Sequence, residues 1–182
     1  MIKTFIQKRK HTNYFTDERG VSAMEMAILF PILMAMIMAV FDLGNGIVVN
    51  QKTVSASQII ADLITRNEVV DMGLIDDVVN AGELALDPYP RTGFGYDIVS
   101  VIFDDDAEPE VLWRVTENMS QGDAAVDLTA GLGEQGEGVV VVTVTNDYEP
   151  LFSGFVVDVY NMSERAFLRG RKSTTVECSD CP

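Results

Sequence analysis

The sequence predicts an α+β fold in which one long N-terminal helix packs on a small antiparallel β-sheet. Three observations support this prediction: an uncharged apolar run from Met26 to Phe41, an amphipathic stretch that continues it to Arg66, and valine-rich segments further along the chain. An apolar run followed by an amphipathic pattern is typical of a helix with a membrane-spanning first half and one apolar face in its second half. That face provides the surface on which a sheet can pack.

Residues 21–43 form the predicted transmembrane helix. Val21 to Phe41 spans roughly 31 Å at ~1.5 Å per residue, which matches the thickness of a bilayer core. The segment that follows, Asp42 to Gly46, lacks the A-x-A pattern of small residues at which secretory signals are cleaved. We therefore expect the helix to be retained and residues 44–66 to extend it as an amphipathic helix.

Charge is divided unevenly between the two sides of the apolar run. Residues 1–20 form a basic leader with five basic and two acidic residues, a net charge of +3, whereas the remaining chain has 8 basic and 26 acidic residues, a net charge of −18. Positive charge that flanks an apolar run holds that end in the cytoplasm. The N-terminus is predicted to be cytoplasmic and the acidic domain to lie outside, and its charge argues against nucleic-acid binding.

The outer domain is predicted to cover residues 67–172. Asp71 to Leu86 has the apolar spacing of a second helix, which Asp87-Pro88-Tyr89-Pro90 ends. Four strands are expected to follow, at Tyr96–Phe103, Val111–Val115, Val139–Asn146 and Glu164–Leu168. Together with the long helix they predict a small antiparallel sheet.

A tail of residues 173–182 carries both cysteines, Cys178 and Cys181, as a C-x-x-C pair. In an oxidising compartment a disulfide is the favoured interpretation. A redox motif would open a helix after a strand. A metal site would need two further ligands, and the only histidine, His11, lies in the leader.

Two other patterns suggest ligands, but a structural interpretation is favoured for each. Residues 131–136 match G-x-G-x-x-G, but a strand follows them, and Glu134 and Glu137 would repel phosphates, so we expect a loop and no dinucleotide cofactor. The acidic turn Asp104–Asp106 lacks the spaced ligands of a calcium loop, so a solvated turn is favoured over a calcium-dependent binding module. The sequence offers no nucleophile–base pair, and we expect no enzymatic activity.

The junction between leader and helix resembles a known family. Arg19-Gly20-Val21-Ser22-Ala23-Met24-Glu25-Met26-Ala27, followed by Pro31, is similar to the N-terminal motif of TadE-like proteins, minor pseudopilins of the Tad (tight adherence, Flp-type) pilus system. Phe41-Asp42-Leu43-Gly44 continues the likeness. The resemblance implies a pilin-like helix, a place in the bacterial inner membrane and a periplasmic domain. It also implies cleavage after Gly20 by a prepilin peptidase, so that the mature chain begins at Val21.

Glu25 becomes the fifth residue of that mature chain. A carboxylate within a membrane segment costs at least about 2.5–3.5 kcal/mol, so it is a candidate functional residue by default. The new amine at Val21 of a neighbouring subunit would offset this cost by pairing with Glu25. The alternative is that Glu25, near the end of the helix, reaches the interface alone.

The implied role is that of a minor pseudopilin that primes, caps or joins the filament. The implied partners are the prepilin peptidase, other pilins and pseudopilins, and the Tad inner-membrane assembly platform. A tip subunit and an assembly factor retained in the membrane both fit the sequence. The alternative function is an uncleaved single-pass membrane protein whose outer domain scaffolds an envelope complex.

Overall fold

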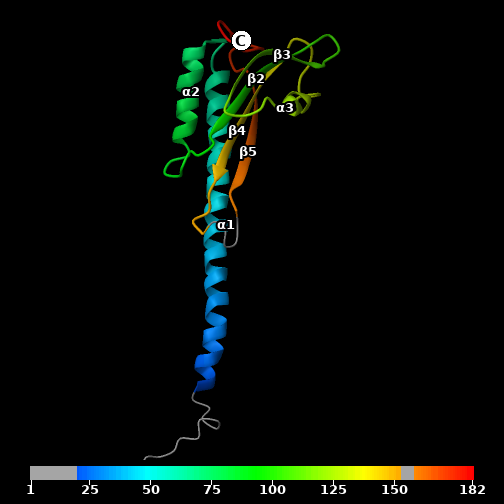
Figure 1. The fold of residues 1–182 in the computed structure, drawn as a ribbon. Helices are drawn as coiled ribbons and strands as arrows, with labels where there is room; N and C mark the ends of the chain where they lie inside the picture. The colour runs from blue at the N-terminus through cyan, green and yellow to red at the C-terminus, as the bar shows by residue number, and fades with distance from the viewer. Residues whose placement is uncertain (1–19, 153–157) are drawn as a thin grey trace, which may run out of the picture.

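The computed structural model describes residues 20–152 and 158–182 and shows one long helix with a domain packed on its second half (Figure 1). The helix, α1 (Val21–Thr65), is continuous over 45 residues, roughly 67 Å at ~1.5 Å per residue. It joins the two predicted segments, 21–43 and 44–66, without an interruption. Its first half extends beyond the domain, as the blue part of the ribbon shows. The predicted α+β class is confirmed.

The domain contains a four-stranded antiparallel sheet in the order β3-β2-β4-β5. All four predicted strands are present, and each is longer than its sequence pattern indicates. The bounds are β2 (Gly95–Phe103), β3 (Pro109–Glu117), β4 (Gly138–Tyr148) and β5 (Tyr160–Arg169). The central strand β4 pairs with β2 on one side and with β5 on the other.

The main core lies between the sheet and two helices, α1 and α2 (Met72–Leu84). Alternate residues of β4, among them Val140, Val142 and Val144, face the helices, because successive side chains of a strand point to opposite faces. Val139 and Val141 point to the other face and form a second cluster with residues of β2 and the short helix α3 (Asp123–Asp127). The valine run of β4 is therefore buried on both faces.

The second helix packs closely against the first through a glycine. A side chain at Gly82 of α2 would begin 2.5 Å from Cγ1 of Ile60 on α1, closer than packed atoms can approach. Ile60 itself is fully buried. The absence of a side chain at Gly82 therefore sets the distance between the helices.

A buried ion pair lies on the sheet face that points away from α1. Asp97 is 1% exposed and accepts hydrogen bonds from Arg114 Nε at 2.8 Å and Nη2 at 2.7 Å, from Thr116 Oγ1 at 2.7 Å and from the Gly122 N–H at 3.2 Å. Burial acts to raise the pKa of Asp97, but these hydrogen bonds outweigh it, and its pKa lies below the ordinary value. The pair joins β2, β3 and the segment that leads to α3.

Two short strands that the sequence did not indicate complete the domain. β1 (Val69–Val70) follows α1 directly, and β6 (Glu177–Cys178) lies within the predicted tail. They pair in parallel, with Val69 opposite Glu177. The tail is thus packed into the domain, and Val176 belongs to the main core.

Candidate processing and assembly site

The predicted cleavage bond lies at the free end of α1. Gly20 precedes Val21, the first helical residue, and both residues are exposed. Apart from its chain neighbours, no described atom lies within 4 Å of the position where a side chain on Gly20 would begin. The bond between Gly20 and Val21 is therefore accessible in this structure. The basic leader before Gly20, including His11, lies outside the described residues.

Glu25 lies in the second turn of α1 and is exposed. Its neighbours are also exposed: Met24 is 69%, Met26 60% and Ile28 66% accessible. The Glu25 carboxylate therefore faces the surroundings of the helix rather than the domain. A carboxyl group among exposed apolar side chains is available to a polar group on another molecule.

The apolar half of α1 has almost no partner among the residues that the structure describes. Among the described residues, α1 is the one helix that is long and apolar enough to cross a membrane, and only 6% of its most apolar 18-residue window is buried. Large apolar side chains such as Phe30, Ile37 and Val40 are more than half exposed. Exposed apolar surface of this extent needs lipid or partner helices to cover it.

Asp42 fixes the domain to the helix where this apolar half ends. Its side chain is 1% exposed, and its two carboxylate oxygens accept hydrogen bonds from the backbone N–H groups of Leu151 at 3.1 Å and Phe152 at 3.2 Å. Phe152 also packs edge-on against Phe41, with ring centroids 6.4 Å apart. The segment after β4 is therefore held against α1 by one buried carboxylate.

Tyr148 adds a third hydrogen bond at the same place. Its hydroxyl donates to the main-chain oxygen of Asp42 at 2.8 Å. Burial raises the pKa of the Tyr148 hydroxyl, and the negative charge of Asp42 acts in the same direction. The hydroxyl therefore stays protonated at neutral pH and remains a donor.

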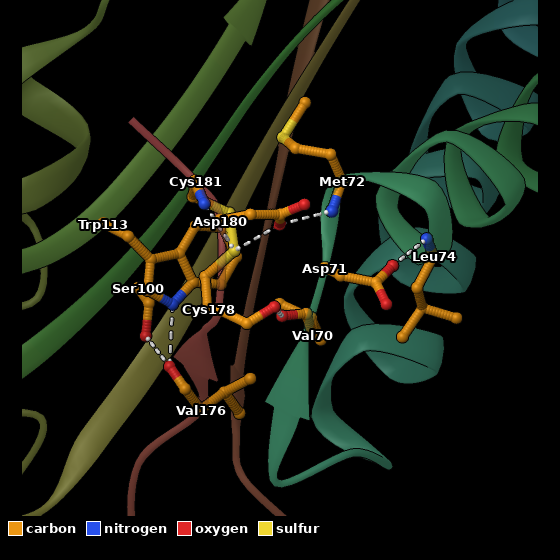
Figure 2. Close-up of a disulfide and its surroundings, with 11 residues drawn as sticks. Val70, Asp71, Met72, Leu74, Ser100, Trp113, Val176, Cys178, Asp180 and Cys181 are labelled. Carbon is orange, nitrogen blue, oxygen red and sulfur yellow. Dashed lines mark hydrogen bonds between the residues drawn. A yellow bond between two sulfur atoms is a disulfide. The ribbon is translucent and has the colours of Figure 1, made fainter.

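The C-terminal tail lies at the end of the domain opposite the apolar half of α1 (Figure 1), and Figure 2 shows its cysteine pair with the surrounding residues. Cys178 and Cys181 form a disulfide. The segment just before it is anchored by Val176, whose carbonyl accepts hydrogen bonds from Ser100 Oγ at 2.9 Å and from Trp113 Nε1 at 2.8 Å. The tail is therefore bound to both β2 and β3.

Asp180, between the two cysteines, links the tail to α2. Its carboxylate accepts a hydrogen bond from the Met72 N–H at 2.9 Å, at the first residue of that helix. Asp180 and the two sulfur atoms also lie close enough to share a metal ion. With the sulfurs joined to each other, neither is the thiolate that a metal would require.

We expect Cys178 and Cys181 to resist thiol reagents in protein isolated under alkylating conditions, and to react after a reductant is added. The physical reason is that the disulfide leaves no free sulfur. The measurement is the mass of the labelled chain with and without reductant. Cys178→Ser is the matched control, because it leaves Cys181 without its partner and should label without reductant. Two labels on the unreduced wild-type chain would show that the disulfide is absent.

The two sequence patterns that suggest ligands have structural explanations. In the G-x-G-x-x-G segment, Gly131 and Gly136 have φ angles of +76° and +77°, which residues other than glycine rarely adopt. In the acidic turn between β2 and β3, Asp104 Oδ1 accepts hydrogen bonds from the N–H groups of Asp106 and Glu108, both at 2.9 Å. The first pattern forms a turn before β4, and the second closes a hairpin.

The structure brings Gly20, Val21 and Glu25 together at one end of α1, and it does not bring the cysteines near them. Sequence reasoning missed the roles of Asp42 and Tyr148. Asp42 is the first charged residue after the apolar run from Met26 to Phe41. A charged residue at the end of such a run is the signal that could have identified it. Tyr148 offered no comparable signal, because its partner lies 106 positions away.

Comparison with known proteins identifies the same segment. Residues 20–62 match the family model described as TadE-like protein. The match covers Gly20, Val21, Glu25 and Asp42 and nearly all of α1. No curated protein and no solved structure matches the chain significantly. The predicted resemblance is confirmed: over its N-terminal helix, this chain is similar to TadE-like proteins.

Proposed function

We propose that this protein is a minor pseudopilin that takes part in the assembly of a Tad-type pilus, by priming, capping or joining the filament. The observation that supports this proposal is the match of residues 20–62 to TadE-like proteins, on a helix whose apolar half is uncovered. The protein acts through helix packing rather than catalysis. Its partners are other pilins and pseudopilins and the inner-membrane assembly platform.

The arrangement of α1 suits this role. The apolar half inserts into the inner membrane and packs there against helices of other subunits, while the second half is fixed inside the domain. Because α1 is one continuous helix and Asp42 ties it to the segment after β4, the domain follows any movement of the membrane half. Joining or capping a filament requires such a rigid connection.

Processing comes first in the proposed sequence of events. A prepilin peptidase on the cytoplasmic side cleaves after Gly20, which leaves the positively charged amine of Val21 at the start of the helix. In an assembly of parallel helices this amine pairs with Glu25 of a neighbouring subunit, and the pairing offsets the cost of a carboxylate in the membrane.

We expect the mature chain to begin at Val21 in cells that possess the prepilin peptidase, and at the leader in cells that lack it. Gly20→Asp should block cleavage and leave membrane insertion intact, because a carboxylate at the cleaved bond disturbs the peptidase site but not the apolar run. The measurement is mass spectrometry of the N-terminus from purified membranes. Gly44→Asp serves as a control, since Gly44 is also exposed but lies far from the bond.

A leader retained in wild-type cells with active peptidase would contradict this proposal. It would favour the alternative, an uncleaved single-pass anchor whose outer domain scaffolds an envelope complex. In that case Gly20→Asp would change neither the N-terminus nor any assembly.

A further inference from the structure

A cavity of about 300 Å³ lies between α1 and the end of β4, on the domain side of Asp42. One wall is formed by Phe41, Asn45 and Val49, which are four positions apart and therefore share one face of α1. The opposite wall is the end of β4, and Tyr89 with Pro90 closes a third side. The volume is at the lower end of the range for ligand pockets, about 300–1,000 Å³.

Asn146 in the β4 wall has a side chain that nothing in the described residues satisfies. The residue is 0% exposed, yet neither its amide nitrogen nor its amide oxygen has a hydrogen-bond partner. The alternation of β4, with Val142 and Val144 in the main core, directs Asn146 toward α1 and the cavity. A buried amide without partners is unfavourable, and such groups in native proteins need an explanation.

A group that satisfies both polar atoms of Asn146 offers a donor and an acceptor together. The amide of Asn146 provides two N–H donors and one carbonyl acceptor next to each other. A peptide group has the complementary pair, an N–H and a C=O. An ammonium group has donors only, and a phosphate has acceptors only, so each would leave part of Asn146 unsatisfied.

Other lining residues give the cavity apolar surface and carboxylate groups. Phe41, Val49 and Tyr148 provide apolar surface, while Asp147 and Glu149 supply carboxylates, and the lining contains no lysine or arginine. Lys52 lies 6.0 Å from the Tyr89 ring centroid, but its ammonium group donates to two main-chain oxygens, those of Ala85 and Asp87. Carboxylates without a free cation disfavour the phosphate of a lipid headgroup.

We propose that this cavity binds an apolar side chain of a partner polypeptide. On binding, the buried side chain of Asn146 rotates toward the cavity, and the peptide group beside the apolar side chain forms hydrogen bonds with both polar atoms of its amide. The lining has room for one large side chain and its peptide group. The site is separate from Gly20 and Glu25 and does not depend on the pilus role. It gives the domain a contact of its own, next to the membrane half of α1.

A pair of small probes tests the proposal on the full-length protein in detergent micelles. N-benzylacetamide carries an aromatic body and a peptide-like amide, and benzyl acetate has the same shape without the N–H donor. The measurement is the change in NMR signals of the cavity residues during titration. We expect the amide to bind roughly five- to tenfold more tightly than the ester, the value of one hydrogen bond.

Asn146→Leu removes the amide but keeps the approximate size of the side chain. We expect this variant to bind both probes equally and to melt at the same or a higher temperature, because an unsatisfied buried amide is lost. Asn80→Leu, at an exposed position of α2, is the matched control and should keep the preference for the amide. The melting temperature shows whether each variant is folded.

Three results would overturn the proposal. Equal affinity of the wild-type protein for both probes would show that Asn146 recognises no peptide group. A lower melting temperature of Asn146→Leu, with no probe bound to the wild type, would show that ordered water fills the cavity. Signals of the cavity residues that change between nanodiscs of phosphatidylethanolamine and phosphatidylcholine, and not with the probes, would assign the cavity to a lipid headgroup.

Discussion

Glu25→Ala is expected to abolish piliation while cleavage after Gly20 and the amount of protein stay unchanged. The variant removes a carboxylate that costs at least about 2.5–3.5 kcal/mol within a membrane, so insertion alone becomes easier. In the proposed assembly the Val21 amine of the neighbouring subunit loses its partner, so we expect assembly to become harder. The measurement is electron microscopy of surface pili, together with the N-terminal mass and the protein level from the same cells.

Two further variants make this test specific to the charge. Glu25→Gln keeps the size of the side chain and should also fail to support piliation, whereas Met26→Ala, at a neighbouring position that is also exposed, should support it. Normal piliation with Glu25→Ala would show that Glu25 reaches the membrane interface alone, and the pairing with Val21 would then be wrong.

Asp97→Ala is expected to cause the largest loss of stability in the domain. Removing one member of a buried pair leaves the other charge uncompensated, which costs about 3–5 kcal/mol. We expect about 3 kcal/mol, because Arg114 keeps a contact of 3.3 Å with the exposed Asp123. The measurement is unfolding of the full-length protein by guanidinium chloride in micelles, followed by the fluorescence of Trp113, the single tryptophan, which is buried.

The same pair predicts a dependence on pH. The pKa of Asp97 lies below its ordinary value of 3.8. The contribution of Asp97 to the free energy of unfolding is therefore complete above pH 3.8 and is lost as the pH falls through the lowered pKa. The difference in stability between wild type and Asp97→Ala should therefore be constant near neutral pH and shrink in acid. Asp123→Ala, which removes the 94% exposed partner of Arg114, should change stability little at any pH. Equal losses of stability for both variants would contradict the expectation that Asp97, and not Asp123, is the main partner of Arg114.

The sequence was sufficient for the fold class because its long elements have strong periodicity. The apolar run and the amphipathic pattern predicted α1, and short apolar segments between turns predicted all four strands of the sheet. The same patterns could not predict the tail, because β1 and β6 are two residues long and have no period to detect. Pairing between them depends on strand contacts over a separation of more than 100 residues.

The residues of the candidate site also differ in whether a local sequence pattern could predict them. Gly20, Val21 and Glu25 are close in sequence, so a local pattern was enough to propose them. Asp42 satisfies N–H groups more than 100 positions away, and Asn146 became notable only when its surroundings were known. A single sequence shows which residues are polar, but it does not show which polar groups are left without partners.

The pairing of β1 with β6 has a consequence for the order in which the domain can form. The chain is synthesised from its N-terminus, so α1 and β1 have left the ribosome long before Val176 is added. Until then Ser100 and Trp113 lack the carbonyl that accepts their hydrogen bonds, and Val70 lacks its partner strand. The core therefore closes only when the chain has been synthesised past Val176. A chain that ends before residue 176 therefore leaves this part of the core open, and proteases can attack the exposed interior.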